Sequence, residues 1–199
     1  MKKALAFLMA AVMLMSMLTA CGNKDNAADN NDADNNNVNT EETDKAAADK
    51  VAALIDAIYV QERTEETDAQ CEAAKAAWDA LTDAQKALVE GEEASPDYFG
   101  LDTGDASKDD PRNQDEIGEK ELLVVSFGTS FNDSRVADIK SVEDALQEAN
   151  PDWSVRRAFT AQIIINHIQA RDGEKIDNMD QALERAVANG VKQLVVQPT

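Results

Sequence analysis

The distribution of apolar residues divides the chain into segments of different character. A nearly unbroken apolar run, Ala4–Met17, follows the basic residues Lys2 and Lys3. Its length is that of the apolar core of a secretory signal peptide and is short for a bilayer span. Residues 22–49 are rich in Asn, Asp and Ala, with almost no large apolar side chain. Because such a segment cannot bury enough surface to offset the entropy of ordering, we predict a disordered tether there.

A small module of three helices is predicted over residues 50–91. Two segments place apolar residues on one helical face, Val51, Leu54, Ile55, Ile58 and then Cys71, Ala74, Trp78, Leu81. Residues 82–85, Thr-Asp-Ala-Gln, have the form of a capping box and begin a third helix, expected to run through Leu88 and end near Gly91. The expected core consists of Leu54, Ile58, Trp78 and Leu88. We expect a spacer or adhesion module without an active site, followed by a polar linker over residues 92–119.

Residues 120–199 alternate between strand and helix patterns. Runs rich in β-branched residues predict strands at residues 121–126, 153–159 and 193–197. The helix between the first two carries the apolar stripe Val136, Ile139, Val142, Leu146 and Ala149. Strands that alternate with helices indicate parallel pairing and right-handed crossovers. The fold class is therefore α/β, a half-built doubly wound sheet flanked by helices.

Two further helices are expected between the second and third strands. Thr160 is the predicted cap of the first, which buries Ile163, Ile164, Ile165 and Ile168 and ends at Gly173. Asp177 is the predicted cap of the second, which buries Met179, Leu183 and Val187 and ends at Gly190. Three parallel strands form a thin core, and the chain stops at a strand end. We therefore expect a larger domain that has lost its second half.

The first strand leads directly into a candidate ligand site. Ser126-Phe127-Gly128-Thr129-Ser130 combines hydroxyl groups with a glycine at the carboxyl end of that strand, where open α/β sheets bind ligands. The sequence has neither the GxGxxG pattern nor the Gly-Lys-Ser/Thr of a P-loop. From the residues alone, a polar ligand site and an ordinary strand-to-helix turn are both open.

The composition argues against nucleic-acid binding and against sites built from several cysteines. The net charge of −20 and the isoelectric point near 4.2 argue against nucleic acid, whose phosphates attract Lys and Arg. Cys21 and Cys71 are the only cysteines, which excludes a disulfide framework and a CxxC metal site. With no basic residue close in sequence, Cys71 is predicted to be a core thiol. His167 is the one histidine, and we expect it on the solvated side of its helix, neither base nor metal ligand.

The residues Leu18-Thr19-Ala20-Cys21 resemble the lipobox of bacterial lipoproteins. The resemblance implies that residues 1–21 form a lipoprotein signal peptide, that Cys21 is lipidated, and that the protein is anchored to the cell membrane on its extracytoplasmic face. A helix retained as an N-terminal anchor is the alternative reading of the apolar run.

Four segments resemble the N-terminal half of the anaerobic sirohydrochlorin cobaltochelatases of the CbiK type: Leu122–Ser130, Arg157–Thr160, Arg171–Gly173 and Val195–Gln197. The resemblance covers residues 120–199. It implies a class II chelatase of two similar α/β lobes, with the tetrapyrrole in the cleft between them. It further implies ATP-independent insertion of Co²⁺ into sirohydrochlorin during anaerobic cobalamin biosynthesis, with cobalt as substrate metal and no nucleotide.

The same resemblance assigns residues to the tetrapyrrole cleft: Ser126, Phe127, Gly128, Thr129, Ser130, Arg157, Phe159 and Thr160. Arg157 would pair with an acetate or propionate of the substrate. Structural roles are the alternative, with Phe127 and Phe159 in the core and Arg157 paired with a helix carboxylate. Whether Arg156 or Arg157 faces the cleft is open.

The family's metal-handling His and Glu residues are expected beyond Thr199. No catalytic or metal-binding residue is therefore expected in this chain, and we expect it to be inactive alone. The alternative function is a surface-anchored lipoprotein that binds a tetrapyrrole such as haem, or a metal, without chelatase activity. Its extracytoplasmic location favours this alternative, because cobalamin intermediates are made in the cytoplasm. A surface adhesin is a third hypothesis, and the oligomeric state, a homo-oligomer included, stays open.

Overall fold

The computed structural model describes residues 32–59, 62–94 and 103–199. The chain divides after Asn36 into two units, and the second contains all of the described elements except the first residues of helix α1. The predicted signal segment, residues 1–21, and residues 22–31 of the predicted tether lie outside the described residues. In the part of the chain that is described, no helix is long and apolar enough to cross a membrane.

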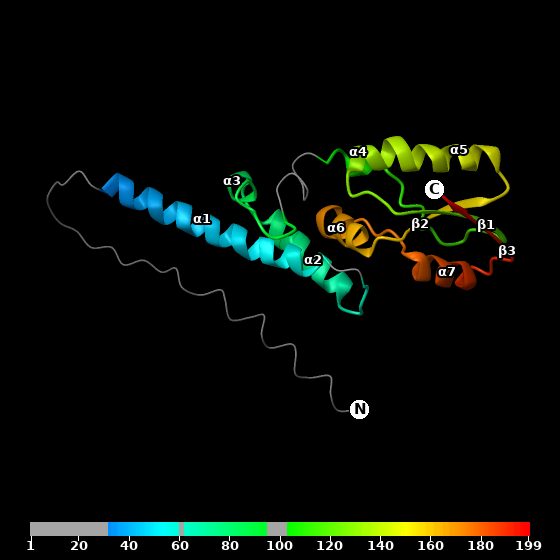
Figure 1. The fold of residues 1–199 in the computed structure, drawn as a ribbon, viewed down its shortest axis with the longest axis horizontal. Helices are drawn as coiled ribbons and strands as arrows, with labels where there is room; N and C mark the ends of the chain where they lie inside the picture. Colours follow the sequence, from blue (N-terminus) through cyan, green and yellow to red (C-terminus); the bar gives the residue numbers. More distant parts are fainter. Residues whose placement is uncertain (1–31, 60–61, 95–102) are drawn as a thin grey trace, which may run out of the picture. The chain divides into compact units, whose positions relative to one another are not determined.

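Residues 32–49 are helical. They form the first part of α1 (Asp32–Ala57), so the prediction of a disordered tether is wrong for this stretch (Figure 1). An Ala-Ala-Ala run at residues 46–48 favours helix, and Lys45 pairs with Asp49 one turn later. Ala48 is fully buried in the same apolar cluster as Ile55. Tertiary packing therefore extends the helical module toward the N-terminus, and the predicted boundary at residue 50 falls within a helix.

The helical module consists of α1, α2 (Thr67–Asp79) and the short α3 (Asp83–Lys86). The predicted capping box of Thr82 and Gln85 is confirmed, although α3 ends earlier than expected. The core contains Cys71 as predicted, and its buried members are Ala48, Val51, Ala52, Ile55, Ile58, Cys71, Ala74, Trp78, Val89, Ala94 and Ala170. Burial raises the pKa of the Cys71 thiol to about 11, which makes it unreactive. Leu54 and Leu88 were expected in this core, but they are 38% and 40% exposed.

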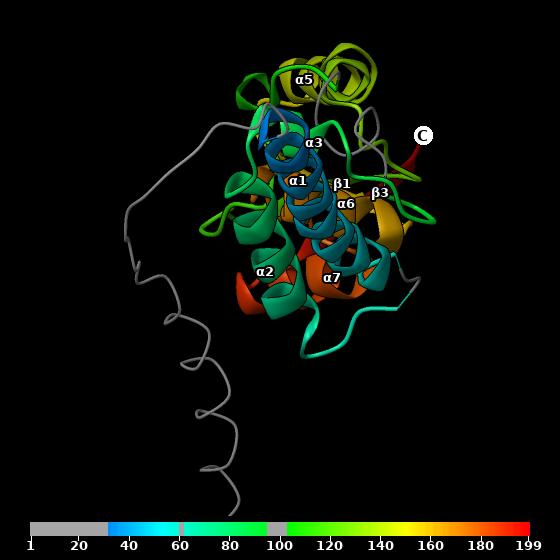
Figure 2. The same ribbon diagram turned by 90° about the vertical axis from the view of Figure 1, so that its left-hand side faces the viewer.

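The α/β part contains a sheet of β1 (Lys120–Ser126), β2 (Ser154–Phe159) and β3 (Gln193–Pro198) in the order β2-β1-β3, with both pairings parallel. Helices α5 (Ser141–Ala149) and α7 (Met179–Ala188) cover opposite faces (Figures 1 and 2). Leu122 and Val124 pack toward Leu146 of α5, whereas Leu123 packs against Ala182 of α7. The predicted α/β fold with a parallel sheet between helices is confirmed.

The remaining elements are short except for α6 (Gln162–Asp172). A 3₁₀ turn spans Ala106–Lys108, and α4 (Asn132–Ser134) continues through a π-helical turn, Arg135–Lys140, into α5. Gly173 ends α6 in the left-handed conformation, φ +76°, as predicted.

Two predicted helix caps are wrong. Ala161, not Thr160, precedes α6, and Asn178, not Asp177, caps α7 through a capping box with Gln181. The side chain of Asp177 instead forms ion pairs with Arg156 and Arg185.

The predicted apolar stripe of α6 is confirmed, since Ile164, Ile165 and Ile168 are buried, but that of α7 is wrong in part. On α7, Leu183 and Val187 are 39% and 81% exposed, while Ala182 and Ala186 are buried. The small alanine side chains allow close approach of the helix to the sheet. Strand β3 is exposed along its whole length, although it is paired with β1.

The helical module packs directly on the α/β part. Helix α6 lies between α2 and the sheet (Figures 1 and 2). The Cys71 thiol donates a hydrogen bond to the Asn166 carbonyl (3.5 Å), and the Asn166 amide donates to the Ile58 carbonyl (2.9 Å). These buried contacts cross from one part to the other. The module is therefore a structural element of the same unit, beyond the spacer that the sequence suggested.

Residues 103–119 are not a free linker. Arg112 is buried, its main-chain oxygen accepts a hydrogen bond from Arg156 Nε (3.0 Å), and Ile117 is also buried. Asp109 accepts hydrogen bonds from two arginines of the α/β part. This segment therefore belongs to the α/β part, and the linker prediction is wrong for it.

Candidate functional site

The loop after β1 crosses the carboxyl edge of the sheet, where the sequence placed the candidate site. Gly128 has φ +99°, a conformation that side chains other than glycine rarely adopt. A Cβ atom at this position would lie 2.5 Å from Cδ2 of Phe159. The loop main chain therefore rests directly on the Phe159 ring, and glycine is required for this approach.

Main-chain hydrogen bonds hold the three strand ends together. The amide of Thr160 donates to the Ser126 carbonyl (2.9 Å), and that of Thr199 donates to the Val125 carbonyl (2.9 Å). The ends of β2 and β3 are thus fixed to the end of β1. The loop starts from a rigid platform, which favours a preorganised site.

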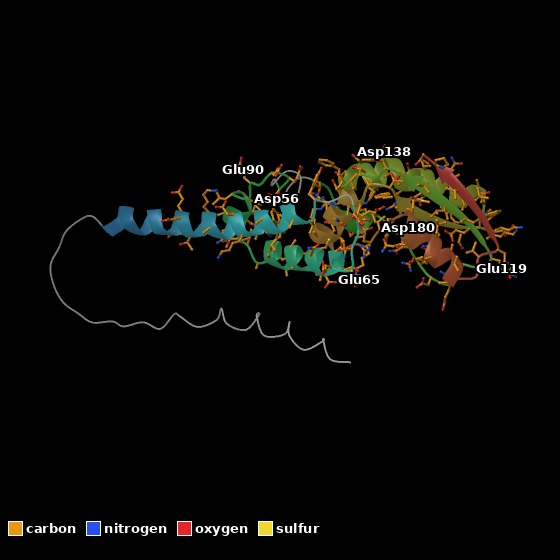
Figure 3. The ribbon with its side chains drawn as sticks, turned by 60° about the horizontal axis from the view of Figure 1, so that its bottom comes forward. Asp56, Glu65, Glu90, Glu119, Asp138 and Asp180 are labelled. Atoms are coloured by element: carbon orange, nitrogen blue, oxygen red, sulfur yellow. The ribbon has the colours of Figure 1, made fainter. Side chains whose placement is uncertain are left out.

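A pocket of about 320 Å³ lies beside this loop, on the α5 face. Its lining residues are Val124, Ser126, Phe127, Gly128, Asp138, Ile139, Val142 and Thr199 (Asp138 is labelled in Figure 3). The Ser126 hydroxyl is buried and, among the described residues, has no hydrogen-bond partner. The Phe127 ring is 67% exposed at the rim. An unpartnered hydroxyl and an exposed aromatic ring in one pocket are a suitable environment for a ligand with both polar and flat apolar parts.

A second pocket, of about 360 Å³, lies at the end of β2. It is lined by Glu62, Arg63, Phe159, Thr160, Gln162, Asn178, Met179 and Asp180 (Asp180 is labelled in Figure 3). Thr160 is exposed there. Two of these residues, Glu62 and Arg63, come from the helical module, so the module contributes to the strand-end region.

Arg157 was expected to bind a substrate carboxylate, but its side chain is not available to a ligand. Its guanidinium is fully buried and forms two hydrogen bonds to Glu143 (both 2.8 Å) and two to Asp109 (2.7 and 3.0 Å). Burial alone would raise the pKa of Asp109, but hydrogen bonds and charge from Arg157 and Arg135 hold it below its usual value. The geometry supports the structural alternative, in which Arg157 pairs with a helix carboxylate.

Arg156 is buried on the opposite face of β2. Its Nη2 atom donates to Asp177 (3.0 Å), which also accepts from Arg185 of α7. The two neighbouring arginines therefore point to opposite faces of the sheet, and neither faces the strand-end site. Alternation along the strand explains the opposite directions.

Two other predicted site residues support the loop from below. Phe159 is fully buried under Gly128, and Ser130 is 3% exposed. The Ser130 carbonyl accepts a hydrogen bond from Arg171 Nη2 (2.7 Å), and Arg135 Nη1 donates to the Thr129 carbonyl (3.3 Å). Ser126, Phe127 and Gly128 line the first pocket, and Phe159 and Thr160 line the second, whereas Thr129 follows Gly128 in the loop and lines neither.

The sequence did not identify Arg135 and Arg171 as the two arginines that hold the loop in position. Arg171 lies in the Arg171–Gly173 motif, which the family resemblance singled out without a role. Asn132 accepts hydrogen bonds from both Arg171 (3.1 Å) and Arg135 (2.6 Å), so it joins α6 to the π-helical turn behind the loop. Only the contacts between distant segments reveal this role.

The prediction for His167 is wrong. The side chain is 1% exposed, and its ring meets the Tyr59 ring edge-on at 5.2 Å. The helical module covers the side of α6 that was expected to face solvent. Burial, with a smaller contribution from the Arg171 charge, lowers the pKa of His167 to about 4, against a weaker opposing effect of Asp56.

Acidification is expected to destabilise the protein through His167. Its pKa is lower in the folded protein than in the unfolded chain, about 6.5, so the unfolded chain binds the proton more tightly. The contribution to stability is constant above pH 6.5 and falls as pH drops from 6.5 toward 4, by up to about 3 kcal/mol at 1.36 kcal/mol per pKa unit. Urea denaturation at pH 7.5 and 5.0, with His167→Asn as comparison, measures it. Equal pH dependence of the two proteins would contradict this prediction.

Metal ligands are not clustered in the described part of the chain. Among residues 32–59, 62–94 and 103–199, no group of three or more His, Cys, Asp or Glu side chains has the geometry to hold a metal ion.

The fold and the loop define an α/β domain with a candidate ligand site at the carboxyl edge of a parallel sheet. Residues 120–199 match the family model of the cobalt chelatase CbiK. A sirohydrochlorin cobaltochelatase of Salmonella typhimurium is 42% identical over 79 residues, which represent 40% of this chain and 30% of that protein. The chain thus spans less than a third of this curated relative. The α/β part is therefore similar to the cobalt chelatases of the CbiK type, and the matched residues do not include the helical module.

Proposed function

We propose that the α/β part forms one wall of the tetrapyrrole-binding cleft of a sirohydrochlorin cobaltochelatase. The observation that carries the proposal is the strand-end pocket, where the unpartnered Ser126 hydroxyl lies beside the exposed Phe127 ring within the segment that matches the family. The flat ring of a tetrapyrrole offers a face to Phe127, and its carboxylates accept hydrogen bonds from hydroxyl and amide donors.

The substrate-facing residues in this proposal are Ser126, Phe127, Gly128, Thr129 and Thr160. Ser130 and Arg157 lie behind them and hold the loop and its strands in place, while Phe159 supports Gly128 and also lines the second pocket. Insertion of Co²⁺, the substrate metal, without ATP and in anaerobic cobalamin biosynthesis, is proposed for the complete two-lobed protein. Its imidazole and carboxylate groups are those that the family resemblance places beyond Thr199.

Anaerobic titration with sirohydrochlorin, followed by absorbance, tests binding. We expect a spectral shift with the intact chain and at least about tenfold weaker binding by Phe127→Ala, because the stacking surface is removed. Val187→Ala, an exposed apolar residue on α7, is the matched control and should bind like the parent protein. The absence of any spectral shift would refute the proposal. Binding without cobalt insertion, both alone and with the downstream reading frame included, would favour the non-chelatase binding protein.

We also propose that Cys21 is lipidated and anchors the protein on the extracytoplasmic face of the membrane. The support is the Leu-Thr-Ala-Cys sequence behind an apolar run. Metabolic labelling with a palmitate analogue should label the parent protein and not Cys21→Ser. Equal labelling of the two proteins, or no labelling of either, would contradict the anchor.

A further inference from the structure

The second strand-end pocket joins the helical module to the candidate site. Thr160, directly after β2, and Asp180, at the start of α7, line it together with Arg63, which lies in the connection between α1 and α2 (Asp180 is labelled in Figure 3). The apolar part of its lining is Phe159 and Met179. The pocket therefore combines an apolar surface, a hydroxyl group and a guanidinium group.

The guanidinium of Arg63 is held in place from outside the pocket. Its Nη2 atom forms an ion pair with Asp68 at the start of α2. Asp68 also accepts a hydrogen bond from Gln169 of α6 (2.9 Å) and lies 3.5 Å from the ammonium group of Lys175. Because Asp68 is bound to both the module and the α/β part, the position of Arg63 is tied to α6.

Arg63 also supplies a positive charge, which the other described residues that line the two pockets lack. Of the described residues that line the two strand-end pockets, it is the only cation, since the other lining residues are neutral or acidic. Arg157, the cation expected for this role, is enclosed by Asp109 and Glu143. A guanidinium has five donors, and the pair with Asp68 leaves others for a second carboxylate.

We propose that Arg63 binds a peripheral carboxylate of the tetrapyrrole and is a specificity-determining residue supplied by the helical module. The proposal rests on the proposed function and extends the site beyond the segment that matches the family. Glu62 and Asp180 flank the same pocket. They repel further anions, so the pocket accepts one carboxylate arm beside Arg63 and excludes additional negative groups.

The test compares charge removal at Arg63 with charge removal elsewhere on the full-length protein. Arg63→Gln should weaken sirohydrochlorin binding about 10- to 100-fold, the range for loss of a charge-assisted hydrogen bond. Arg63→Lys should recover part of the affinity, since it keeps the charge without the fork geometry. Lys45→Gln is the matched control, because Lys45 is an exposed cation on α1 paired only with Asp49 among the described residues, and it should change affinity less than twofold.

The fully methyl-esterified tetrapyrrole separates carboxylate binding from a general effect on the site. The parent protein and Arg63→Gln should bind this ester equally. Equal binding of sirohydrochlorin by the parent protein and Arg63→Gln would overturn the inference and leave the proposed function intact. The same conclusion would follow if Arg63→Gln weakened binding of the ester as much as binding of sirohydrochlorin. If the parent protein does not bind sirohydrochlorin, the proposed function itself fails. Urea denaturation of each variant verifies that folding is retained.

Discussion

Replacing Arg157 by Met is expected to lower the free energy of unfolding by about 3–5 kcal/mol, the range measured when one partner of a buried ion pair is removed. The substitution leaves Asp109 and Glu143 buried without the guanidinium that both of them bind. Arg135 still reaches Asp109, and Arg112 lies 3.4 Å from Glu143. Neither of them replaces the four hydrogen bonds that Arg157 donates.

Chemical denaturation at pH 7 measures this loss. Lys192→Met is the control, since Lys192 and Glu119 form an exposed ion pair whose removal should cost less than about 1 kcal/mol. The result also distinguishes two roles of Arg157. A loss below about 1 kcal/mol, together with weaker sirohydrochlorin binding, would restore the ligand-binding role that the sequence suggested.

Substitution of Gly128 by Ala is expected to destabilise the fold by about 2–4 kcal/mol and to weaken tetrapyrrole binding. Two effects add here: the left-handed conformation at φ +99°, and the overlap of the new Cβ with the Phe159 ring at 2.5 Å. Phe159 is fully buried, so a shift of its ring disturbs the packing of the core. We expect the loop to lift away from the strand ends, which moves Phe127 out of the pocket.

Gly118→Ala provides the matched control for this substitution. Gly118 also has a positive φ, +68°, but no atom lies within 4 Å of the position of its Cβ. It should cost about 1–2 kcal/mol, the backbone term alone, and leave ligand affinity unchanged. Equal destabilisation by the two substitutions would show that the contact between Gly128 and Phe159 does not constrain the loop.

Local sequence determined the elements and their order in the α/β part. The β-branched runs form β1, β2 and β3, and their parallel pairing follows from the intervening helices. Gly173 ends α6, and in the helical module the capping box of Thr82 and Gln85 begins α3, both as predicted. These features depend on φ/ψ preferences and on hydrogen bonds within a few residues. The strand-end position of the loop at residues 126–130 was predictable for the same reason.

Tertiary structure decided which side of each element is buried. Leu183 and Val187 are exposed because Ala182 and Ala186 face the sheet, and His167 is buried because the helical module covers α6. Periodicity identifies an amphipathic helix but does not show which neighbour lies on its polar side. Residues 32–49 became helical although their composition resembles a tether, since part of this segment packs into the module core.

The sequence by itself thus determined the α/β class, the parallel strands and the place of the candidate site. Only the tertiary structure decided the roles of the charged residues. Arg156 and Arg157 are adjacent in sequence, yet each is paired with carboxylates from a different face of the sheet, 14 to 48 residues away along the chain. Arg63 reaches the strand-end pocket from a separate module. Long-range charge pairing depends on which segments the fold brings together, and that information is not contained in any local pattern.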